Sequence, residues 1–421
     1  MSAHFDCDVL VIGAGVAGTA AAILLARAGW RVVLVEQHPY PRRKVCGECI
    51  AAGNIALLDE LGIGAVFRAS AGPELRRVGW MGRQATVSAA MPPCLQGPYA
   101  YGRALGRDRL DSLLLQRAMD LGVAVRQPAR VRAVRGEFGR YVCTIDSRGA
   151  CAASRSSSDT LRTPIVIDAH GSWERPPEFA DGVGATRPRA LQRASDLFAF
   201  KANFRDTALA PGFLPVLALP GGYGGMVLGD DGRTTVACCI RRDTLAACRS
   251  RAPGSSAGAT VEQYLRRSCA GLRVVLADAQ RDGAWLSVGP LQPGIRVDAR
   301  ARAFRIGNAA GESHPLIGEG ISMALQSAAL LAATLVGHPP ALVAGQRALA
   351  LQAAYAGAWR RAFAPRLRLA ALYAHIAMRP TLAEPARLLL GRWPTLLHVG
   401  ARLAGKATRA TDLTFTTAEI A

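Results

Sequence analysis

The 421-residue sequence has few acidic residues, with 31 Asp and Glu against 51 Lys and Arg, and its formal net charge is +20. This balance suits anionic partners. The sequence lacks zinc-finger, RNA-recognition and basic-zipper patterns, however, so we expect no nucleic-acid partner. Charged residues make up 19% of the chain and apolar residues 50%, which favours a globular protein with a large core over a disordered one.

The first residues lack the charged and apolar regions of a secretory signal. We therefore expect a cytoplasmic protein with reduced cysteines. One uncharged run, 321–338, is almost long enough to span a bilayer. Because it includes Ser322, Gln326 and Ser327, it predicts instead a buried helix of an α/β domain.

Cys46 and Cys49 form a Cys-x-x-Cys pair, which suits a redox dithiol, half of a metal site or part of a cofactor pocket. The sequence lacks a second Cys-x-x-Cys pair and a His-x-x-x-His partner. A structural zinc site needs such partners, so we predict no metal.

The most informative feature present is Gly-x-Gly-x-x-Gly at Gly13, Gly15 and Gly18, between a buried strand at 8–12 and an Ala- and Leu-rich helix. The first glycine permits a tight turn, the second leaves room for a pyrophosphate at the helix N-terminus, and the third lets the helix lie close to the strand. Strand, glycines and helix in this order predict a dinucleotide site.

A second buried strand at 31–35 closes on Glu36, eighteen residues after Gly18. A carboxylate at this point can accept hydrogen bonds from a ribose diol. The ligand predicted by this unit is NAD or FAD.

Three later segments bear on that choice. A short strand leads into Gly307 and Asn308, and a long helix begins near Gly320, which offers backbone N–H groups to an electron-rich ligand. Another strand ends in Asp168 and Gly171 within 163–175.

In the third segment, Arg107 precedes Leu-Asp at 110–111 and a helix. With these three segments, the sequence resembles the FAD-dependent oxidoreductases that include geranylgeranyl reductases, flavin-dependent aromatic hydroxylases and related halogenases. The resemblance covers about residues 5 to 345. In that group an acid holds the ribityl chain where Asn308 stands here. The resemblance implies FAD bound by Gly13, Gly15, Ala17, Gly18, Glu36, Gln37, Arg43, Cys46, Gly47, Arg107, Val131, Asp168, Gly171, Asn308, Gly318, Gly320 and Ile321.

Lys-x-Cys-Gly, ending in Cys46 and Gly47, resembles the reductase-like branch, whereas Cys49 lies outside the shared pattern. FAD-dependent disulfide reductases place four residues between their cysteines and carry a second glycine fingerprint, and both features are missing. We favour Cys46 and Gly47 as flavin-pocket residues over an inert packed pair or a dithiol. Cys46 and His314 are the catalytic candidates. Glu48 is a further polar candidate, and the alternative for it is a salt bridge to Arg42, Arg43 or Lys44.

Short alternating segments with Gly and Asp-Gly turns at about 190–290 predict an antiparallel sheet. The candidates for its apolar substrate wall are Phe198, Phe200, Phe204, Phe213, Tyr223 and Trp285. After residue 345 we expect several helices separated by Pro365, Pro380, Pro385 and Pro394. We therefore expect an α/β fold: a Rossmann-like FAD-binding domain (1–75, 100–180 and 291–345), an antiparallel β-sheet substrate domain (76–99 and 181–290) and a helical C-terminal cap (346–421).

The expected function is FAD-dependent hydroxylation of an apolar or aromatic metabolite of secondary metabolism, with polyketide-derived compounds among the candidates and with electrons from NAD(P)H or another reductant. Saturation of double bonds in a hydrophobic substrate is the first alternative, and FAD binding without turnover is the second. The partner is a hydrophobic small molecule. The arginine-backed C-terminal helices suit either a packed cap or peripheral membrane contact.

Overall fold

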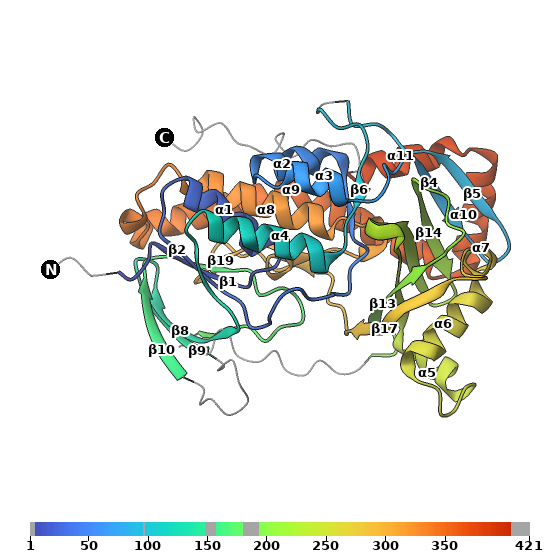
Figure 1. Ribbon diagram of the computed structural model, residues 1–421, viewed down its shortest axis with the longest axis horizontal. Helices are drawn as coiled ribbons and strands as arrows, with labels where there is room; N and C mark the ends of the chain where they lie inside the picture. The colour runs from blue at the N-terminus through green and yellow to red at the C-terminus, as the bar shows by residue number, and fades with distance from the viewer. Residues whose placement is uncertain (1–4, 96, 148–156, 180–192, 406–421) are drawn as a thin grey trace.

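The computed structural model describes residues 5–95, 97–147, 157–179 and 193–405 (Figure 1). Its first layer is a five-stranded parallel sheet in the order β19-β11-β1-β2-β7. The central strands are apolar throughout because both faces of the sheet are covered. The strands are β1 (Val9–Ile12), β2 (Val32–Val35), β7 (Ala124–Arg126), β11 (Val166–Asp168) and β19 (Phe304–Arg305).

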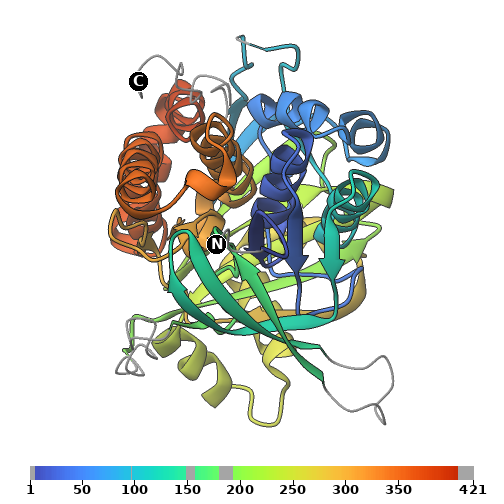
Figure 2. The ribbon, with the colours of Figure 1, turned by 90° about the vertical axis from the view of Figure 1, so that its left-hand side faces the viewer.

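Three helices cover one face of this sheet (Figures 1 and 2). Helix α1 (Val16–Arg27) packs against α4 (Arg107–Asp120) and α8 (Gly320–Leu335). Helix α8 is the uncharged run of the sequence, and its Ser322, Gln326 and Ser327 are buried inside the protein as predicted. Within the described ranges, every helix is too short or too polar to cross a membrane.

A second, largely antiparallel sheet covers the other face of the parallel sheet (Figure 1). Its order is β10-β9-β8-β12. This layer was not predicted from the sequence. The strands are β8 (Ala129–Glu137), β9 (Arg140–Ser147), β10 (Ser157–Thr163) and β12 (Glu178–Phe179).

The predicted substrate sheet has seven strands in the order β17-β13-β16-β15-β14-β4-β5. All neighbours are antiparallel except β14 and β4, which run parallel. The strands are β4 (Arg77–Met81), β5 (Thr86–Ala90), β13 (Leu197–Arg205), β14 (Phe213–Leu219), β15 (Gly222–Leu228), β16 (Thr234–Arg241) and β17 (Gln280–Val288).

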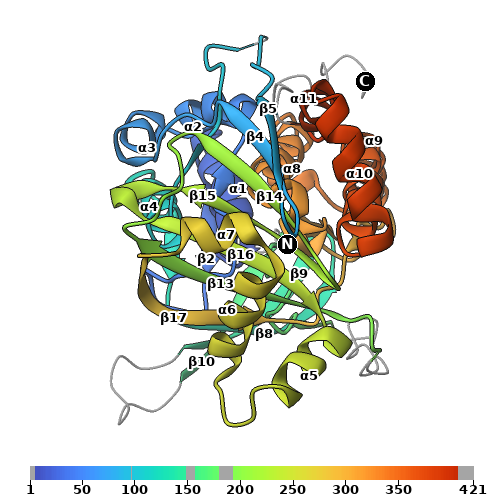
Figure 3. The same ribbon diagram turned by 90° about the vertical axis from the view of Figure 1, so that its right-hand side faces the viewer.

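Helices α5 (Arg242–Ser250), α6 (Ala257–Ser268) and α7 (Ala270–Val275) cover this sheet on one side (Figure 3). The sequence alone did not predict them. Helix α6 forms because Ser256 caps it, its Oγ accepting from the N–H of Ala259 at 3.2 Å, and because Val261 and Leu265 are buried.

Short elements connect these layers. They are β3 (Cys49–Ile50), α2 (Ile55–Glu60), α3 (Gly64–Ser70), β6 (Arg103–Ala104), β18 (Gly294–Ile295) and β20 (Gly311–Glu312).

Three helices end the described chain: α9 (Gly345–Ala377), α10 (Pro380–Arg392) and α11 (Thr395–Leu403). Pro365 and Pro385 lie inside helices and do not separate them, which corrects the prediction. Packing of Trp359 on Phe363, with ring centroids 5.0 Å apart, holds α9 together next to its proline. The division into three domains stays a proposal, and its residues 1–4, 180–192 and 406–421 lie outside the described ranges.

Candidate active site

A cavity of about 460 Å³ lies between the parallel-sheet layers, the seven-stranded sheet and the C-terminal helices. This volume is typical of ligand sites. Most of the residues predicted to hold the cofactor line it: Gly13, Gly15, Ala17, Glu36, Gln37, Cys46, Gly47, Arg107, Val131, Gly171, Asn308, Gly318, Gly320 and Ile321. Gly18, Arg43 and Asp168 do not line it, and neither does His314.

The second and third glycines of the motif after β1, Gly15 and Gly18, have different environments. A Cβ added to Gly18 would stand 1.9 Å from the carbonyl oxygen of Gly13, so Gly18 serves helix packing. A Cβ added to Gly15 would meet nothing closer than Arg107 Nη2 and Lys44 Nζ, both at 3.9 Å. Gly15 therefore opens on a space that faces two cations at the N-terminus of α1.

These cations are held by a buried carboxylate. Asp111 accepts both Nε and Nη2 of Arg107 at 2.8 Å and pairs with Lys44 Nζ at 3.1 Å. Burial alone would raise the pKa of Asp111, but Arg107 and Lys44 hold it below its ordinary value. The cluster of Arg107, Lys44 and Asp111 therefore carries a net charge of +1, which suits a phosphate-bearing ligand.

Glu36 closes the other side of the glycine turn. It is buried, and its Oε2 accepts from the N–H of Ala14 at 2.9 Å while Oε1 accepts from the N–H of His38 at 3.0 Å. The carboxylate is thus fixed at the end of β2 on the cavity wall, where a ribose diol can donate to it.

Asp168 lies behind the cavity wall and does not line the cavity. Its carboxylate is buried and lies 2.5 Å from Nδ1 of His170, which does line the cavity. Burial would raise the pKa of Asp168, but His170 and Arg305 lower it. Asp168 is therefore placed to orient His170 and not to contact a ligand itself, contrary to the prediction.

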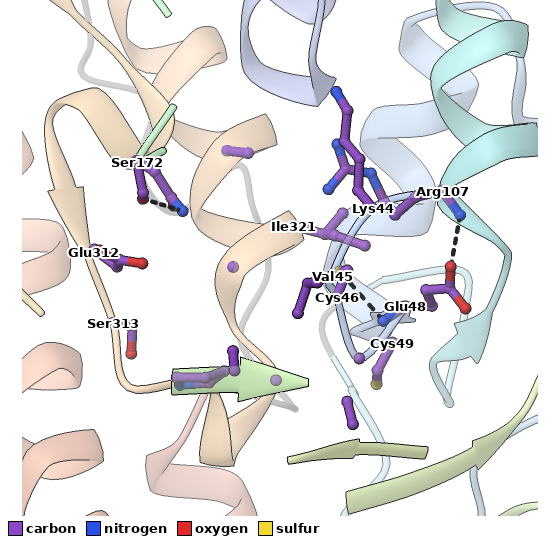
Figure 4. Close-up of a pocket in the computed structure, with 18 of the residues that line it drawn as sticks. Lys44, Val45, Cys46, Glu48, Cys49, Arg107, Ser172, Glu312, Ser313 and Ile321 are labelled. Carbon is purple, nitrogen blue, oxygen red and sulfur yellow. Dashed lines mark hydrogen bonds between the residues drawn. The ribbon is translucent and has the colours of Figure 1, made fainter. Parts of the chain in front are cut away.

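The far end of the predicted cofactor site is formed by the loop before α8 (Figure 4). Gly320 and Ile321 bring the N-terminus of α8 to the cavity, where helix N–H groups lack intrahelical acceptors. Asn308 donates from Nδ2 to Oγ of Ser172 at 2.9 Å. Its amide is thus kept at the wall by a residue that also lines the cavity.

Arg43, which was predicted to bind the cofactor, lies outside the cavity, and its neighbour Lys44 lines it instead. Arg43 donates to the carbonyl oxygen of Asp282 at 2.8 Å, outside the cavity, whereas Lys44 lines it. Burial lowers the pKa of the Lys44 ammonium, and Asp111 opposes this effect.

Glu48 forms a buried contact that sequence reasoning missed. It pairs with Lys201 of β13, accepts from Oγ1 of Thr235 at 2.5 Å and accepts from the N–H of Arg107 at 2.8 Å. The prediction that it pairs with Arg42, Arg43 or Lys44 is wrong. Glu48 holds a backbone φ of 58°, a conformation unfavourable for its type, which these three partners stabilise.

Cys46 and Cys49 both lie at the cavity wall (Figure 4). Cys46 is partly buried and its Sγ accepts from the N–H of Glu48 at 3.3 Å. Cys49 is buried in β3 and also borders the cavity, although it lies outside the family pattern.

We expect Cys46→Ser to change the absorbance of bound flavin or the turnover rate, because Cys46 lies beside Arg107 and Glu48 on the loop that lines the cavity. Cys49→Ser should change either quantity by less than about twofold, since it is held within β3. Flavin spectra and turnover of both variants test this. Equal losses in both, reproduced by thiol alkylation, would instead indicate a dithiol.

Beyond the predicted cofactor site the cavity is apolar. Its walls come from the seven-stranded sheet and from the C-terminal helices: Val78, Trp80, Phe200, Leu214, Val216 and Met226, and Tyr373, Leu390, Leu396, Leu397 and Ala401. Of the aromatic residues predicted to form this wall, Tyr223 does so, and Phe200 borders the cavity although it also belongs to the core beneath α5–α7. The prediction is wrong for the other four, Phe198, Phe204, Phe213 and Trp285, which pack on the side of the sheet that carries α5–α7.

A polar patch borders this apolar part. Tyr223 lines the cavity, and its Oη lies 3.0 Å from Nδ1 of His314. Burial raises the pKa of Tyr223 well above its ordinary value and lowers that of His314, so both groups are neutral near pH 7. His314 is a partner of Tyr223 and not a residue of the wall. Burial also raises the pKa of Glu312, which lines the cavity nearby.

These features fit FAD. The open space before Gly15 and its two cations suit the pyrophosphate, Glu36 suits a ribose, and Asn308 with the α8 N-terminus suits the ribityl and ring end. Figure 4 shows the two ends: Lys44, Cys46, Glu48 and Arg107 on one side, with Ser172, Glu312 and Ser313 on the other.

The chain is an FAD-dependent oxidoreductase: residues 6–160 match the model of the FAD binding domain family, and most of the residues predicted to hold FAD line one cavity.

Its relatives include both reductases and oxygenases. The chain is 27% identical over 348 residues to menaquinone reductase of Mycobacterium tuberculosis, covering 80% of this chain and 78% of that protein. It is 26% identical to kynurenine 3-monooxygenase of Stenotrophomonas maltophilia, covering 94% and 86%. The solved myxobacterial chondrochloren halogenase CndH shares the fold with a TM-score of 0.72 and 20% identity, covering 98% and 94%.

Proposed function

We propose that this chain is a flavin-dependent monooxygenase that hydroxylates an apolar or aromatic small molecule. The observation that carries the proposal is the apolar half of the cavity, which continues directly from the predicted ring end of the cofactor site. Such a chamber binds an apolar substrate and keeps water away from the reacting atoms.

Bound FAD supplies the hydride and oxygen chemistry. The protein provides orientation and exclusion of water. Trp80, Val216 and Tyr223 offer the sheet wall against which an aromatic ring packs. Leu390 and Leu397 close the cavity from the cap. In the overall reaction one atom of O2 enters the substrate, the other leaves as water, and NAD(P)H or another reductant supplies two electrons.

The likeness to kynurenine 3-monooxygenase supports this choice because it extends over 94% of the chain and so includes part of the C-terminal helices. The likeness to menaquinone reductase covers 80%. We also propose a cytoplasmic location, because the cysteines within the described ranges form no disulfide, as expected in a reducing compartment.

The test is a single turnover that does not depend on the natural electron donor. FAD-reconstituted protein is reduced with dithionite, freed of excess reductant, and mixed with apolar aromatic compounds under ¹⁸O2. The proposal expects a product that carries one ¹⁸O atom. A product with two added hydrogens, formed without O2, would contradict hydroxylation and indicate a reductase.

Reduction of a double bond is the second candidate, and the Tyr223–His314 pair favours it. Saturation needs a proton at the second carbon, and Tyr223 lies on the cavity wall with a neutral histidine behind it. If the chain is a reductase, Tyr223→Phe should lower turnover about a hundredfold or more, as expected for loss of a general acid. A hydroxylase should keep most of its activity in this variant, so the rate ratio separates the two functions.

A further inference from the structure

The C-terminal helices carry many exposed apolar side chains within the part of the chain that the structure describes. Seven large apolar side chains in α10, in α11 and in the link between them are at least 40% exposed. We call this set the cap face: Leu382, Leu388, Leu389, Trp393, Leu396, Val399 and Leu403. Solitary exposed leucines are common on proteins, but a cluster of this density marks an interaction site.

Helical spacing places most of the cap face and of the cavity wall on different sides of α11, with Leu396 belonging to both. Leu397, Ala401 and Ala404 of the last helical segment line the cavity, at intervals of four and three. Leu396, Val399 and Leu403 recur at intervals of three and four on the outer side. Helix α11 is therefore apolar on two sides while the protein buries one of them, and α10 and α11 both lie at the outer edge of the molecule (Figure 3).

The polar residues among these leucines are mainly arginines. Arg379, Arg387, Arg392 and Arg402 stand in the same stretch, and its one acid, Glu384, is paired with Arg387 at 2.5 Å. Arg392 lies over the ring of Trp393 at 5.7 Å. An apolar face with Trp and Leu, bordered by arginines, is typical of a helix that lies in a membrane interface.

The cap face also meets the cavity. Leu396 is 40% exposed and lines the cavity at the same time. An apolar compound dissolved in a bilayer would therefore find the cavity entrance at the membrane surface.

We propose that α10 and α11 dock the protein on an anionic lipid bilayer, with the cap face in the headgroup region and the cavity opening toward the lipid. Charge selects this occupant over a second copy of the chain. Both partners of a two-fold dimer would present the same arginines, whereas anionic headgroups neutralise them. The docking does not depend on which reaction the enzyme performs.

The experiment uses the full FAD-loaded chain and sedimentation with vesicles of phosphatidylcholine alone or mixed with phosphatidylglycerol. We expect binding to the mixed vesicles that weakens as salt is added. The variant Leu388→Ser, Trp393→Ser, Leu403→Ser should bind about tenfold more weakly or worse, because each change removes apolar surface from the interface. Arg392→Gln and Arg402→Gln should each cost about fivefold.

The matched control replaces three exposed apolar residues outside the cap face, Val66→Ser, Leu342→Ser and Leu349→Ser. It should bind like the wild type, and circular dichroism checks that both triple variants are folded. Equal losses in the two triple variants, or wild-type binding that ignores lipid charge, would overturn the proposal. So would a dimer in solution that the cap-face variant splits while vesicles bind neither protein.

Discussion

Replacing Gly15 with alanine is expected to weaken FAD binding by about 1–3 kcal/mol, which is about fivefold to 150-fold in the dissociation constant, while leaving the folded protein unchanged. The folded chain accepts the methyl group, since the nearest atoms to the new Cβ are two cationic nitrogens at 3.9 Å. The same methyl group would occupy the space in which the pyrophosphate approaches the backbone.

Two further glycine variants make this test specific. Gly18→Ala places its Cβ 1.9 Å from the Gly13 carbonyl oxygen, so it should lower the stability of the protein even without FAD. Gly337→Ala meets no atom within 4 Å and should change neither quantity. Titration of apoprotein with FAD and urea unfolding of the apoprotein measure the two effects separately. If Gly15→Ala binds FAD as tightly as the wild type, the pyrophosphate does not lie next to Gly15.

Replacing Lys201 with methionine should destabilise the protein by about 3–5 kcal/mol, because it leaves the buried Glu48 carboxylate without its countercharge. Glu48 joins the loop before β3 to the seven-stranded sheet through Lys201 and Thr235. The loss should therefore also loosen the cavity wall that carries Cys46.

The double variant Glu48→Gln, Lys201→Met should recover part of this loss, since it buries no unpaired charge. The control is the exposed pair of Arg140 and Glu137, where Arg140→Gln should cost less than about 1 kcal/mol. Urea midpoints of the apoproteins give the comparison. If Lys201→Met is no more destabilising than Arg140→Gln, the buried pair does not hold the two sheets together.

The cofactor motifs could be predicted because their geometry is local. A strand, three glycines and a helix within about twenty residues determine where Gly13, Gly15 and Gly18 lie, and Glu36 follows on the neighbouring parallel strand. The structure brings Arg107, Gly171 and Asn308 to the same cavity from segments that carry their own turn and helix signals.

Side-chain directions that depend on distant partners could not be predicted. Arg43 turns away from the cavity to reach Asp282, which is 239 residues later, and Glu48 finds Lys201 after 153 residues. Asp168 fits the motif, yet its carboxylate is taken by His170 two residues on. The Asp-x-His spacing was the one local signal that could have indicated this contact.

The prediction of which aromatic residues of the sheet line the cavity failed for a related reason. A strand places successive side chains on opposite faces, and the sequence does not say which face the cavity takes. Helices α5–α7 cover one face, so Phe204 and Trp285 belong to the core below them, with ring centroids 6.2 Å apart.

The most direct test of the central claim is the binding of FAD to the purified chain and its reduction. The account predicts that the protein takes up one FAD per chain with the visible spectrum of an oxidised flavin, and that Gly15→Ala is folded but retains less flavin. If both the wild type and Gly15→Ala stay colourless after reconstitution with FAD, the claim that this chain binds FAD is contradicted.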